Sequence, residues 1–325
     1  MFKRVPLNPL DPNIATSPSQ FRMNSKVKGG KPASLKEAGY EETGKIIGEG
    51  GMGLVSLVEC AGKLFVCKES STSDQRHIQK EWYALSRVSG IRGIPKLIDY
   101  VKLADGTCFL IMEFIQNAVD LPTFHRLHGF MTWDEQRYFA SRLLEILQEA
   151  HARGIVHRDL KGENVLVQEK NGLLEPILID WGLACAIGKS TDPCGTRYAM
   201  PPEMILSDAK PFSQSDESVD VWGFGVVLYE LLFGQDPFHL YDNYDELDDA
   251  IVDCVWDDRG QTNNNSSYMM DEQTYDFFDG IFQLQEERVK FEYIKFHLDS
   301  YFQEEKSGII LDWNDDDVPP GLNMV

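Results

Sequence analysis

The chain has little cysteine: six residues in 325, none of them in a C-x-x-C pair. This scarcity argues against a zinc framework and a disulfide scaffold, and it favours a reducing compartment. Long apolar runs are also missing, because the run from Val226 to Phe233 is short and contains Glu230. We therefore expect no membrane span. No continuous apolar stretch follows the basic residues near the N-terminus, so we do not expect a secretory signal.

Basic residues are the scarcer charged class, with 31 Lys and Arg against 52 Asp and Glu and a formal net charge of -21. Residues 241–325 contain 22 acidic and 5 basic residues, whereas residues 1–40 contain 7 basic and 2 acidic ones. An acidic body repels nucleic-acid phosphates and attracts basic peptides, so we expect no nucleic-acid partner. The charge alone equally fits a surface that is merely kept soluble.

The length and the 42% hydrophobic content suit one large domain or two lobes that share a cleft. Residues 1–39 are rich in Pro, Ser, Asn, Gly and Lys, and they are predicted to form a disordered basic arm. Residues 305–325 are predicted to form an acidic C-terminal tail. The domain between them, at 40–304, is divided into a small sheet-rich lobe at 41–115 and a helical lobe at 116–304.

Local patterns predict the elements of both lobes. Alternating polar and apolar residues at 44–70, around a Gly-rich turn, indicate a strand, a hairpin and a strand. Further strands are expected at 96–102, 107–114, 164–167 and 176–179. Helices are expected at 74–89, 133–152 and 221–233, the last of them apolar all round, and a loop at 257–270. The sequence contains no internal repeats.

One short string combines the groups needed for phosphoryl transfer: His157-Arg158-Asp159-Leu160-Lys161-Gly162-Glu163-Asn164. A carboxylate in such a turn can align a hydroxyl nucleophile, a lysine can neutralise a moving phosphoryl group, and an amide can hold magnesium. The alternative is a charged surface loop. A match of this length rarely arises by chance, so we favour the catalytic interpretation.

A glycine-rich string with the pattern G-x-G-x-x-G-x-V runs from Gly48 to Val55. Glycines let backbone amides approach phosphates closely, where side chains would block them. Rossmann folds use a similar string, but here strand-like residues follow where a Rossmann unit would have a helix. The sequence has no G-x-x-x-x-G-K-[ST] string, which disfavours a P-loop NTPase.

Lys68 ends a V-C-K string fifteen residues after Gly53. A lysine there can contact the α- and β-phosphates of a nucleotide if a carboxylate holds it. Glu81 on the predicted helix is the best candidate, because Glu69, next to Lys68 on a strand, would point to the opposite face. A solvated strand lysine is the alternative, and the spacing to the other motifs argues against it.

Asp180 begins a D-W-G string directly after the apolar run at 177–179. A carboxylate at the end of such a strand can chelate a magnesium ion that bridges the β- and γ-phosphates. Three further strings follow in order: C-G-T at 194–196, P-P-E at 201–203 and D-V-W-G-F-G at 220–225. Arg288 comes near the end of the predicted domain.

Taken together, these motifs resemble a eukaryotic-type protein kinase over about residues 44–302. The resemblance implies an α+β, bilobal fold with a small five-stranded β-sheet lobe that carries one helix, a larger helical lobe, and ATP between them. Lys161 and Thr196 form the pair typical of serine/threonine kinases. The groups needed for chemistry are complete, which favours a non-specific serine/threonine protein kinase over a pseudokinase-type scaffold or binding module.

The resemblance assigns roles to individual residues. The catalytic residues would be Lys68, Glu81, Asp159, Lys161, Asn164 and Asp180, and the magnesium ligands Asn164 and Asp180. The ATP-binding residues would be Gly48, Glu49, Gly50, Gly51, Met52, Gly53, Val55, Val66, Lys68, Met112 as gatekeeper, Glu113, Ile115, Asp120 and Leu166. The structural residues would be Glu203, paired with Arg288 in a buried bridge, and Asp220, which would brace the catalytic loop.

The string G-T-R-x-x-x-P-P-E at 195–203 resembles Pim-type kinases, on the calmodulin-kinase-like branch. The six residues between Glu113 and Asp120 also match the hinge length of that group. Asp192 stands at the usual activation-loop phosphosite, two residues before Cys194. We expect it to supply a fixed negative charge, with phosphorylation of Ser190 or Thr191 as the alternative.

Three acidic residues suggest a preference for basic substrates. Glu163 matches a position that faces an upstream arginine in basophilic kinases, and Asp120 and Glu230 match other acids of that groove. Each alone is more often a solvated carboxylate, but the three together, with the acidic body, favour a basophilic Ser/Thr specificity. Thr196 and the segment up to Glu203 match the peptide-docking loop of protein kinases, which argues against a small-molecule kinase.

The predicted partners are therefore protein substrates with basic residues two or three positions before the acceptor Ser or Thr. We expect a cytoplasmic or nuclear monomer with ATP and Mg²⁺ as cofactors and without a membrane partner.

Overall fold

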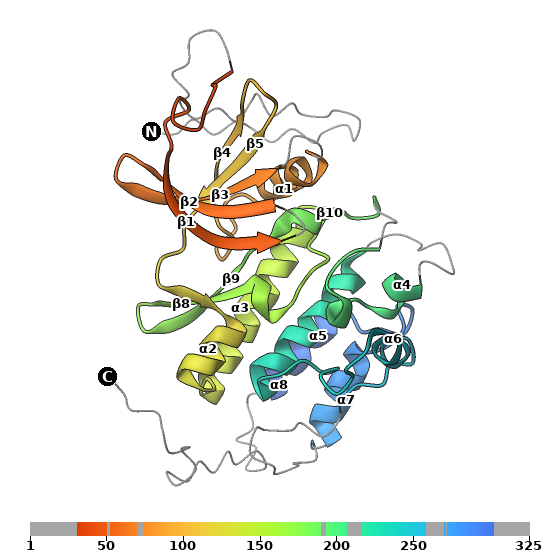
Figure 1. Ribbon diagram of the computed structural model, residues 1–325. Helices are drawn as coiled ribbons and strands as arrows, with labels where there is room; N and C mark the ends of the chain where they lie inside the picture. The colour runs from red at the N-terminus through yellow and green to blue at the C-terminus, as the bar shows by residue number, and fades with distance from the viewer. Residues whose placement is uncertain are drawn as a thin grey trace.

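The computed structural model describes residues 31–50, 53–70, 75–189, 193–206, 216–257, 270 and 272–301. The chain folds into a small sheet-rich lobe and a larger helical lobe, the α+β bilobal arrangement predicted from the sequence (Figure 1). The small lobe contains a five-stranded antiparallel sheet in the order β1-β2-β3-β5-β4. Its strands are β1 (Glu41–Gly50), β2 (Gly53–Cys60), β3 (Lys63–Ser70), β4 (Leu97–Lys102) and β5 (Cys108–Glu113).

The segment 44–70 forms parts of three strands, where the sequence pattern predicted two strands with a hairpin between them. The second turn, between β2 and β3, is Ala61-Gly62, and both residues have a positive φ, 51° and 75°. Two consecutive left-handed residues suit the tight turn of a two-residue hairpin. Alanine rarely takes this conformation, so the local sequence does not predict the turn.

Residues 31–40 are folded against the sheet, so the prediction of a disordered arm is wrong for residues 31–39. Leu35 and Tyr40 are 5% and 6% exposed, and they pack with Val58 and Phe109 of the sheet. The Tyr40 hydroxyl lies 3.3 Å from Asp99 Oδ2. The remainder of the predicted arm, residues 1–30, lies outside the described residues.

The helix of the small lobe is α1 (Arg76–Arg87), shorter at both ends than the predicted 74–89. It buries one face, which contains Ile78, Trp82 and Leu85 and also the carboxylate residue Glu81. Apolar residues at a spacing of three and four place them on this face. The helix therefore turns Glu81 inward, where the side chain is buried and contacts Lys68 of β3.

The large lobe is mainly helical. Its helices are α2 (Leu121–His128), α3 (Trp133–Ala152), α4 (Pro202–Ile205), α5 (Glu217–Phe233), α6 (Tyr244–Val252), α7 (Glu272–Ile281) and α8 (Phe291–Tyr301). The bounds of α3 equal the predicted ones, because Thr132 and Glu135 form a capping box at its start. The strands are β6 (Ala118–Asp120), β7 (Ile155–Val156), β8 (Val165–Lys170), β9 (Leu173–Leu178) and β10 (Cys185–Ala186).

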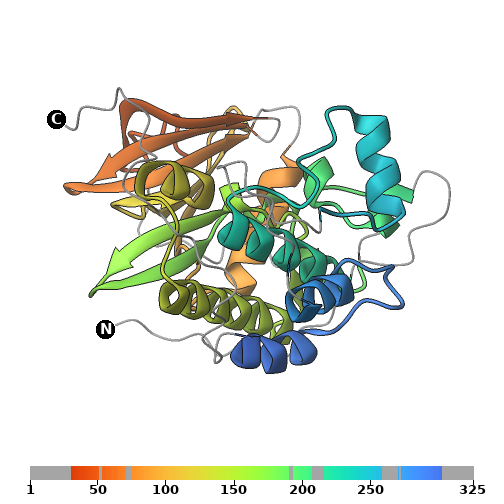
Figure 2. The same cartoon turned by 90° about the horizontal axis from the view of Figure 1, so that it is seen from below.

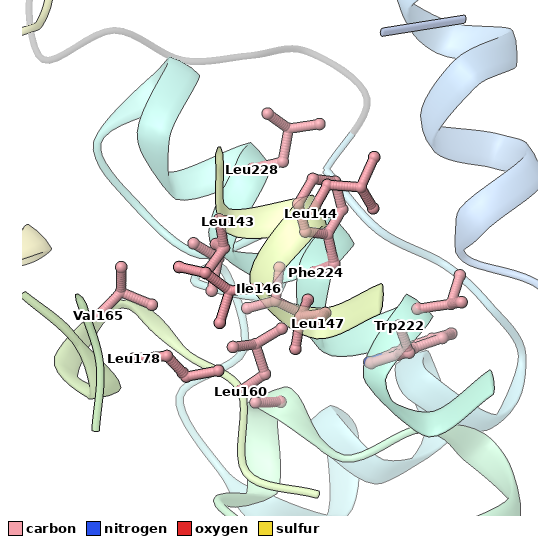
Figure 3. Packing of buried hydrophobic residues seen from close by; sticks show 14 of the residues in the cluster. Leu143, Leu144, Ile146, Leu147, Leu160, Val165, Leu178, Trp222, Phe224 and Leu228 are labelled. Atoms are coloured by element: carbon pink, nitrogen blue, oxygen red, sulfur yellow. The ribbon is translucent and has the colours of Figure 1, made fainter. Parts of the chain in front are cut away.

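The core of the large lobe lies around α3 and α5. Helix α5 is buried on every side from Val219 to Phe233, as its uniformly apolar sequence predicted. Figure 3 shows Leu160, from the segment that follows Asp159, among Ile146 and Leu147 of α3. Burying a leucine contributes roughly 1.5–3 kcal/mol. The core therefore anchors the segment that carries the predicted catalytic residues.

Seen from below, α6 lies at the edge of the large lobe, away from the hairpin formed by β8 and β9 (Figure 2). Of the predicted loop at 257–270, Asp257 is buried and its carbonyl accepts a hydrogen bond from Tyr229. The rest of that loop, apart from residue 270, and the predicted tail at 305–325 lie outside the described residues. No helix of the described part of the chain is long and apolar enough to cross a membrane.

Candidate active site

A cavity of about 520 Å³ opens between the two lobes. Its volume is in the range of sites that bind small molecules and cofactors. The predicted residues that line it are Gly48, Val55, Val66, Lys68, Glu81, Met112, Glu113, Ile115, Asp120, Glu163, Asn164, Leu166 and Asp180. The lining residues to which the sequence assigned no role are Ile47, Leu85, Pro95, Phe114, Ala118, Val119, Ile179 and Trp181. These are mostly apolar, and apolar residues in a cleft and in a core have the same local sequence signal.

Lys68 connects three elements at the back of this cavity. Its Nζ lies 2.8 Å from Glu81 Oε2 on α1 and 2.9 Å from Asp180 Oδ1, which follows β9. Burial favours the neutral amine, but the two carboxylates outweigh it and raise the pKa of Lys68 above its ordinary value. The lysine is therefore held as a cation, and the predicted pairing with Glu81 is present.

Asp220 braces the loop that contains Asp159. Its Oδ1 accepts a hydrogen bond from Arg158 N at 2.9 Å, and its Oδ2 accepts one from His157 N at 2.8 Å. His151 Nε2 of α3 lies 2.7 Å from the same Oδ2. These donors compensate the loss of water and hold Arg158 in a left-handed conformation at φ 72°.

The pKa of Asp220 reflects the balance between burial and these donors. The side chain is 1% exposed, and burial alone would raise its pKa. The hydrogen bonds and the charges of His151 and His157 outweigh burial, so the pKa lies below the ordinary aspartate value. The brace is therefore an ionised carboxylate at neutral pH.

Asp159 is fixed by Thr196 and Asn164. Its Oδ1 accepts hydrogen bonds from Thr196 N at 2.8 Å and Thr196 Oγ1 at 2.9 Å, and its Oδ2 accepts one from Asn164 Nδ2 at 3.0 Å. Lys161 Nζ in turn donates to Thr196 Oγ1 at 2.6 Å. The threonine, predicted to bind substrate, thus also connects Asp159, predicted to align the acceptor hydroxyl, with Lys161, predicted to neutralise the transferring phosphoryl group.

The residues present suit a hard divalent cation. Asn164 directs its amide nitrogen to Asp159, at 2.7 Å from the carbonyl oxygen, so its Oδ1 is the amide atom left for a cation. Asp180 has a left-handed backbone at φ 57°, and burial would raise its pKa, but Lys68 keeps that pKa below the ordinary value. An amide oxygen and an ionised carboxylate are ligands that Mg²⁺ prefers.

The described residues of the glycine-rich string end β1 and begin β2, where Gly50 pairs with Gly53. Gly53 has φ 123°, and a Cβ there would lie 2.2 Å from the carbonyl oxygen of Glu69 on β3, so no other residue fits. Gly48 has room for a Cβ, with its nearest contact at 3.7 Å. Glu49 and Gly50 continue the β1 ladder opposite Leu54 and Gly53. Gly51 and Met52 lie outside the described residues.

The connection between the lobes begins at the end of β5. Met112 pairs with Val66 across the sheet, and Glu113 N donates to Lys96 O at 2.9 Å. Asp120, at the far end of the connection, caps α2 by accepting a hydrogen bond from Thr123 N at 2.9 Å. A carboxylate that caps a helix is fixed in place, and the second oxygen of Asp120 is left for the cavity that this residue lines.

Acidic side chains gather where the large lobe meets the cavity mouth. Glu230 of α5 is buried against Gly162, and Tyr198 donates to Glu163 Oε2 at 2.6 Å. Burial, and then the charges of Glu163, Asp236 and Asp120, raise the pKa of Glu230 to about 8. Sequence reasoning missed Asp236, because an acid in a turn is usually a surface residue.

Two ion pairs hold the segment after Thr196. Arg288 makes a two-pronged contact with Glu203, at 2.7 and 2.8 Å, and this is the pair predicted from the sequence. Arg197 makes a similar contact with Asp248 of α6, with Nε 2.6 Å from Oδ1, and no motif indicated it. The predicted charge at Asp192 and its alternatives Ser190 and Thr191 lie outside the described residues.

Comparison with known proteins agrees with this geometry. The profile of the protein kinase domain matches residues 41–297. The chain is 35% identical over 156 residues, 46% of this chain and 47% of the relative, to "Serine/threonine-protein kinase pim-2" from Danio rerio. It is 33% identical over 204 residues, 60% of this chain and 46% of the relative, to "Serine/threonine-protein kinase ppk25" from Schizosaccharomyces pombe. The chain thus spans about half the length of the curated relatives it matches.

Proposed function

The chain belongs to the protein kinase domain family, and from that premise we propose that it is an active serine/threonine protein kinase. It would transfer the γ-phosphoryl group of ATP to hydroxyl groups of protein substrates. The observation that carries this proposal is the convergence of Lys68, Asp180 and Asn164 on one cavity, with Lys68 ion-paired on both sides and Asp159 hydrogen-bonded to Asn164. Both compared relatives are named as serine/threonine-protein kinases.

The residues of this chain would act mainly by positioning and charge, as phosphoryl transfer requires. Lys68, held by Glu81, would bind the phosphates of the nucleotide. Asp159 would accept the hydrogen bond of the acceptor hydroxyl and orient it, and Lys161 would face the transferring group. Magnesium, when bound by Asn164 and Asp180, would neutralise the charge that develops on the phosphates.

A pseudokinase scaffold would lack at least one of these groups. All four of these side chains are present and are held by hydrogen bonds or ion pairs: Lys68, Asp159, Asn164 and Asp180. We therefore propose the enzyme and not the scaffold.

The finer part of the proposal is a preference for basic substrates. Burial, and then the charges of Glu163 and Asp236, raise the pKa of Glu230, and Tyr198 donates a hydrogen bond to Glu163. A guanidinium group brought there by a substrate would relieve this repulsion and take two-pronged hydrogen bonds. We expect arginine two or three residues before the acceptor.

The test is transfer of radiolabelled phosphate from ATP to a degenerate peptide array, with the Asp180→Asn variant as control. We expect labelling of Ser and Thr peptides with upstream arginine, and none above background from the variant. Equal labelling by both proteins would contradict the proposed enzyme. A preference for upstream acidic residues would contradict only the proposed substrate class.

A further inference from the structure

One short segment of the large lobe connects the loop that contains Asp159 to helix α6. It is the stretch 195–198, in which a 3₁₀ turn begins at Arg197. The Arg197 side chain makes its two-pronged contact with the carboxylate of Asp248 on α6. We propose that Asp248 is a positioning residue for phosphoryl transfer, which acts through Arg197 to hold Thr196 against Asp159. The inference rests on the proposed function and adds to it a residue that is not among the described residues lining the cavity.

The first half of this segment is packed tightly against the loop that contains Asp159. Gly195 has φ 118°, and a Cβ there would lie 3.0 Å from the carbonyl oxygen of Arg158 and 3.6 Å from Asp159 Oδ1. Thr196 donates two hydrogen bonds to the same Oδ1, at 2.8 Å from its backbone nitrogen and 2.9 Å from its hydroxyl. A small movement of this backbone would therefore move the Asp159 carboxylate or break its hydrogen bonds.

The geometry of the turn sends neighbouring side chains of the segment in different directions. Three residues per turn place successive side chains about 120° apart. Arg197 accordingly reaches α6, whereas Tyr198 donates to Glu163 Oε2 at 2.6 Å. The turn is closed by Ala199 N, which donates to Thr196 O at 2.8 Å. Because the turn begins directly after Thr196 and is bonded to it, the orientation that Arg197 gives to the turn also fixes the place of Thr196.

Helix α6 is a firm support for this contact. Its buried face contains Leu247 and Ile251, which belong to the core of the large lobe. The Asn243 side chain caps its first turn with a hydrogen bond of 2.9 Å. Helix α6 also lies beside α4, which follows the same segment in the chain (Figure 1). The Asp248 carboxylate is therefore held by a packed helix, and it offers Arg197 a fixed point of attachment.

The ion pair contributes to position more than to stability. The side chains of Arg197 and Asp248 are 38% and 24% exposed, and exposed ion pairs add little to the free energy of unfolding. The two-pronged contact nevertheless fixes the orientation of the guanidinium plane as well as its distance. A misplacement of about 1 Å that arises far from the chemistry can lower a rate about 100-fold. The loss of this pair should therefore affect the rate of transfer and leave the fold intact.

The experiment measures the kinetics of Asp248→Asn, with Asp249→Asn as the matched control. Asp249 is the next residue of α6, it is exposed, and the change removes the same charge. We expect Asp248→Asn to lower kcat about tenfold, since Thr196 keeps its hydrogen bonds to Asp159 but is held less firmly. The loss should be equal for a peptide with upstream arginine and for its alanine counterpart. KM for ATP, the stoichiometry of nucleotide binding and the midpoint of denaturant unfolding should remain those of the wild type, and Asp249→Asn should leave kcat unchanged.

A double-mutant cycle tests whether Asp248 acts through Arg197. Arg197→Gln should lower kcat at least as much as Asp248→Asn, and the variant with both changes should lose no more than Arg197→Gln alone. Arg197→Lys, which keeps the charge but not the two-pronged contact, should recover part of kcat. If the losses of the two single variants multiply in the double variant, to about 100-fold, the residues act independently and the inference is overturned.

Two further outcomes would contradict this inference and leave the proposed function standing. One is a wild type that phosphorylates the peptides while Asp248→Asn and Asp249→Asn have the same kcat. The other is a loss of activity in Asp248→Asn that follows a lower unfolding midpoint and a lower stoichiometry of nucleotide binding, which would assign the pair a structural role. A wild type that labels no peptide contradicts the proposed function itself.

Discussion

Helix α5 carries two buried carboxylates in opposite electrostatic surroundings. Asp220, at its start, receives hydrogen bonds from two backbone amides and contacts His151, and its pKa is lowered. Glu230, near its end, faces the acidic residues Glu163 and Asp236, and its pKa is raised to about 8. Both side chains are nearly inaccessible to solvent. Burial alone therefore does not determine the direction in which the pKa of either carboxylate shifts.

The opposite pKa shifts of Asp220 and Glu230 distinguish two roles that a buried carboxylate can have. A carboxylate with a full set of donors holds a loop in one shape, and its removal leaves those donors without a partner. A carboxylate surrounded by like charge weakens the fold, and the proposed preference for basic substrates would explain it by a cation that arrives with a substrate. On that proposal, one helix carries a structural acid, Asp220, and a binding acid, Glu230.

The largest expected effect is at the structural acid. Asp220→Ala should lower the free energy of unfolding by about 3–5 kcal/mol, because the donors of His157 and Arg158 lose their buried acceptor. Peptide phosphorylation should be lost as well, since Arg158 is no longer held at a positive φ. Denaturant unfolding and a peptide assay measure the two effects. Asp220→Asn, which keeps one acceptor oxygen, should recover part of the stability. If Asp220→Ala is as stable as the wild-type protein, the structural role that distinguishes Asp220 from Glu230 is contradicted.

The second effect is at the binding acid and concerns substrate affinity. Glu230→Gln should raise KM for a peptide with upstream arginine about 10- to 100-fold, because the guanidinium loses an ionic partner. We expect kcat to stay within about twofold and the protein to be at least as stable as wild type. A matched peptide with alanine in place of arginine is the control, and its KM should not change. A similar loss with both peptides would assign Glu230 a structural role.

A third effect is the pH dependence of stability. The pKa of Glu230 is about 4.5 in an unfolded chain and about 8 in the folded protein. Between these values the unfolded state has released a proton that the folded state retains, so stability falls as pH rises from about 4.5 to about 8. Relative to Glu230→Gln, the wild type should lose a few kcal/mol over this range. Parallel unfolding curves at several pH values test this, and a constant difference would contradict it.

The smallest effect is at His125 on α2, a half-buried side chain whose ring nitrogens have no compensating partner among the described residues. Neither ring nitrogen has a hydrogen-bond partner among the described residues, and burial lowers its pKa to about 4. As pH falls from about 6.5 to about 4, His125 binds a proton in the unfolded state but not in the folded state, so the free energy of unfolding falls. His125→Phe should be about 1 kcal/mol more stable than wild type at low pH and equal to it at pH above about 7. Thermal unfolding of both proteins at several pH values measures this difference. Equal unfolding curves for the variant and the wild type at all pH values would contradict it.

The sequence predicted the parts of the fold that local chemistry determines. The α3 bounds followed from a capping box and a periodic apolar face, and the buried α5 followed from its uniform apolar character. The pairing of Lys68 with Glu81 followed from motif spacing together with strand alternation, which turned Glu69 away. Such features depend on residues that are close in sequence or on strings with a known chemical purpose.

The parts that were missed depend on contacts between distant segments. Leu35 and Tyr40 stand in a polar stretch, and only the outer face of the sheet makes them core residues. Asp236 becomes part of an acidic cluster because α5 ends beside the catalytic loop. Arg197 and Asp248 are ordinary surface types whose contact appears only when α6 is in place. A single sequence carries no local signal for any of these.

The carboxylate of Asp220 also sets an order of events during synthesis. It lies 63 residues after His157, the first residue of the loop that it shapes. At about 5–20 residues per second, a ribosome makes the loop several seconds before it makes the acceptor for the loop amides. A nascent or truncated polypeptide that ends before helix α5 would contain the whole string at 157–164 yet lack the carboxylate that holds it, so the proposed phosphoryl transfer would begin only after Asp220 has been made.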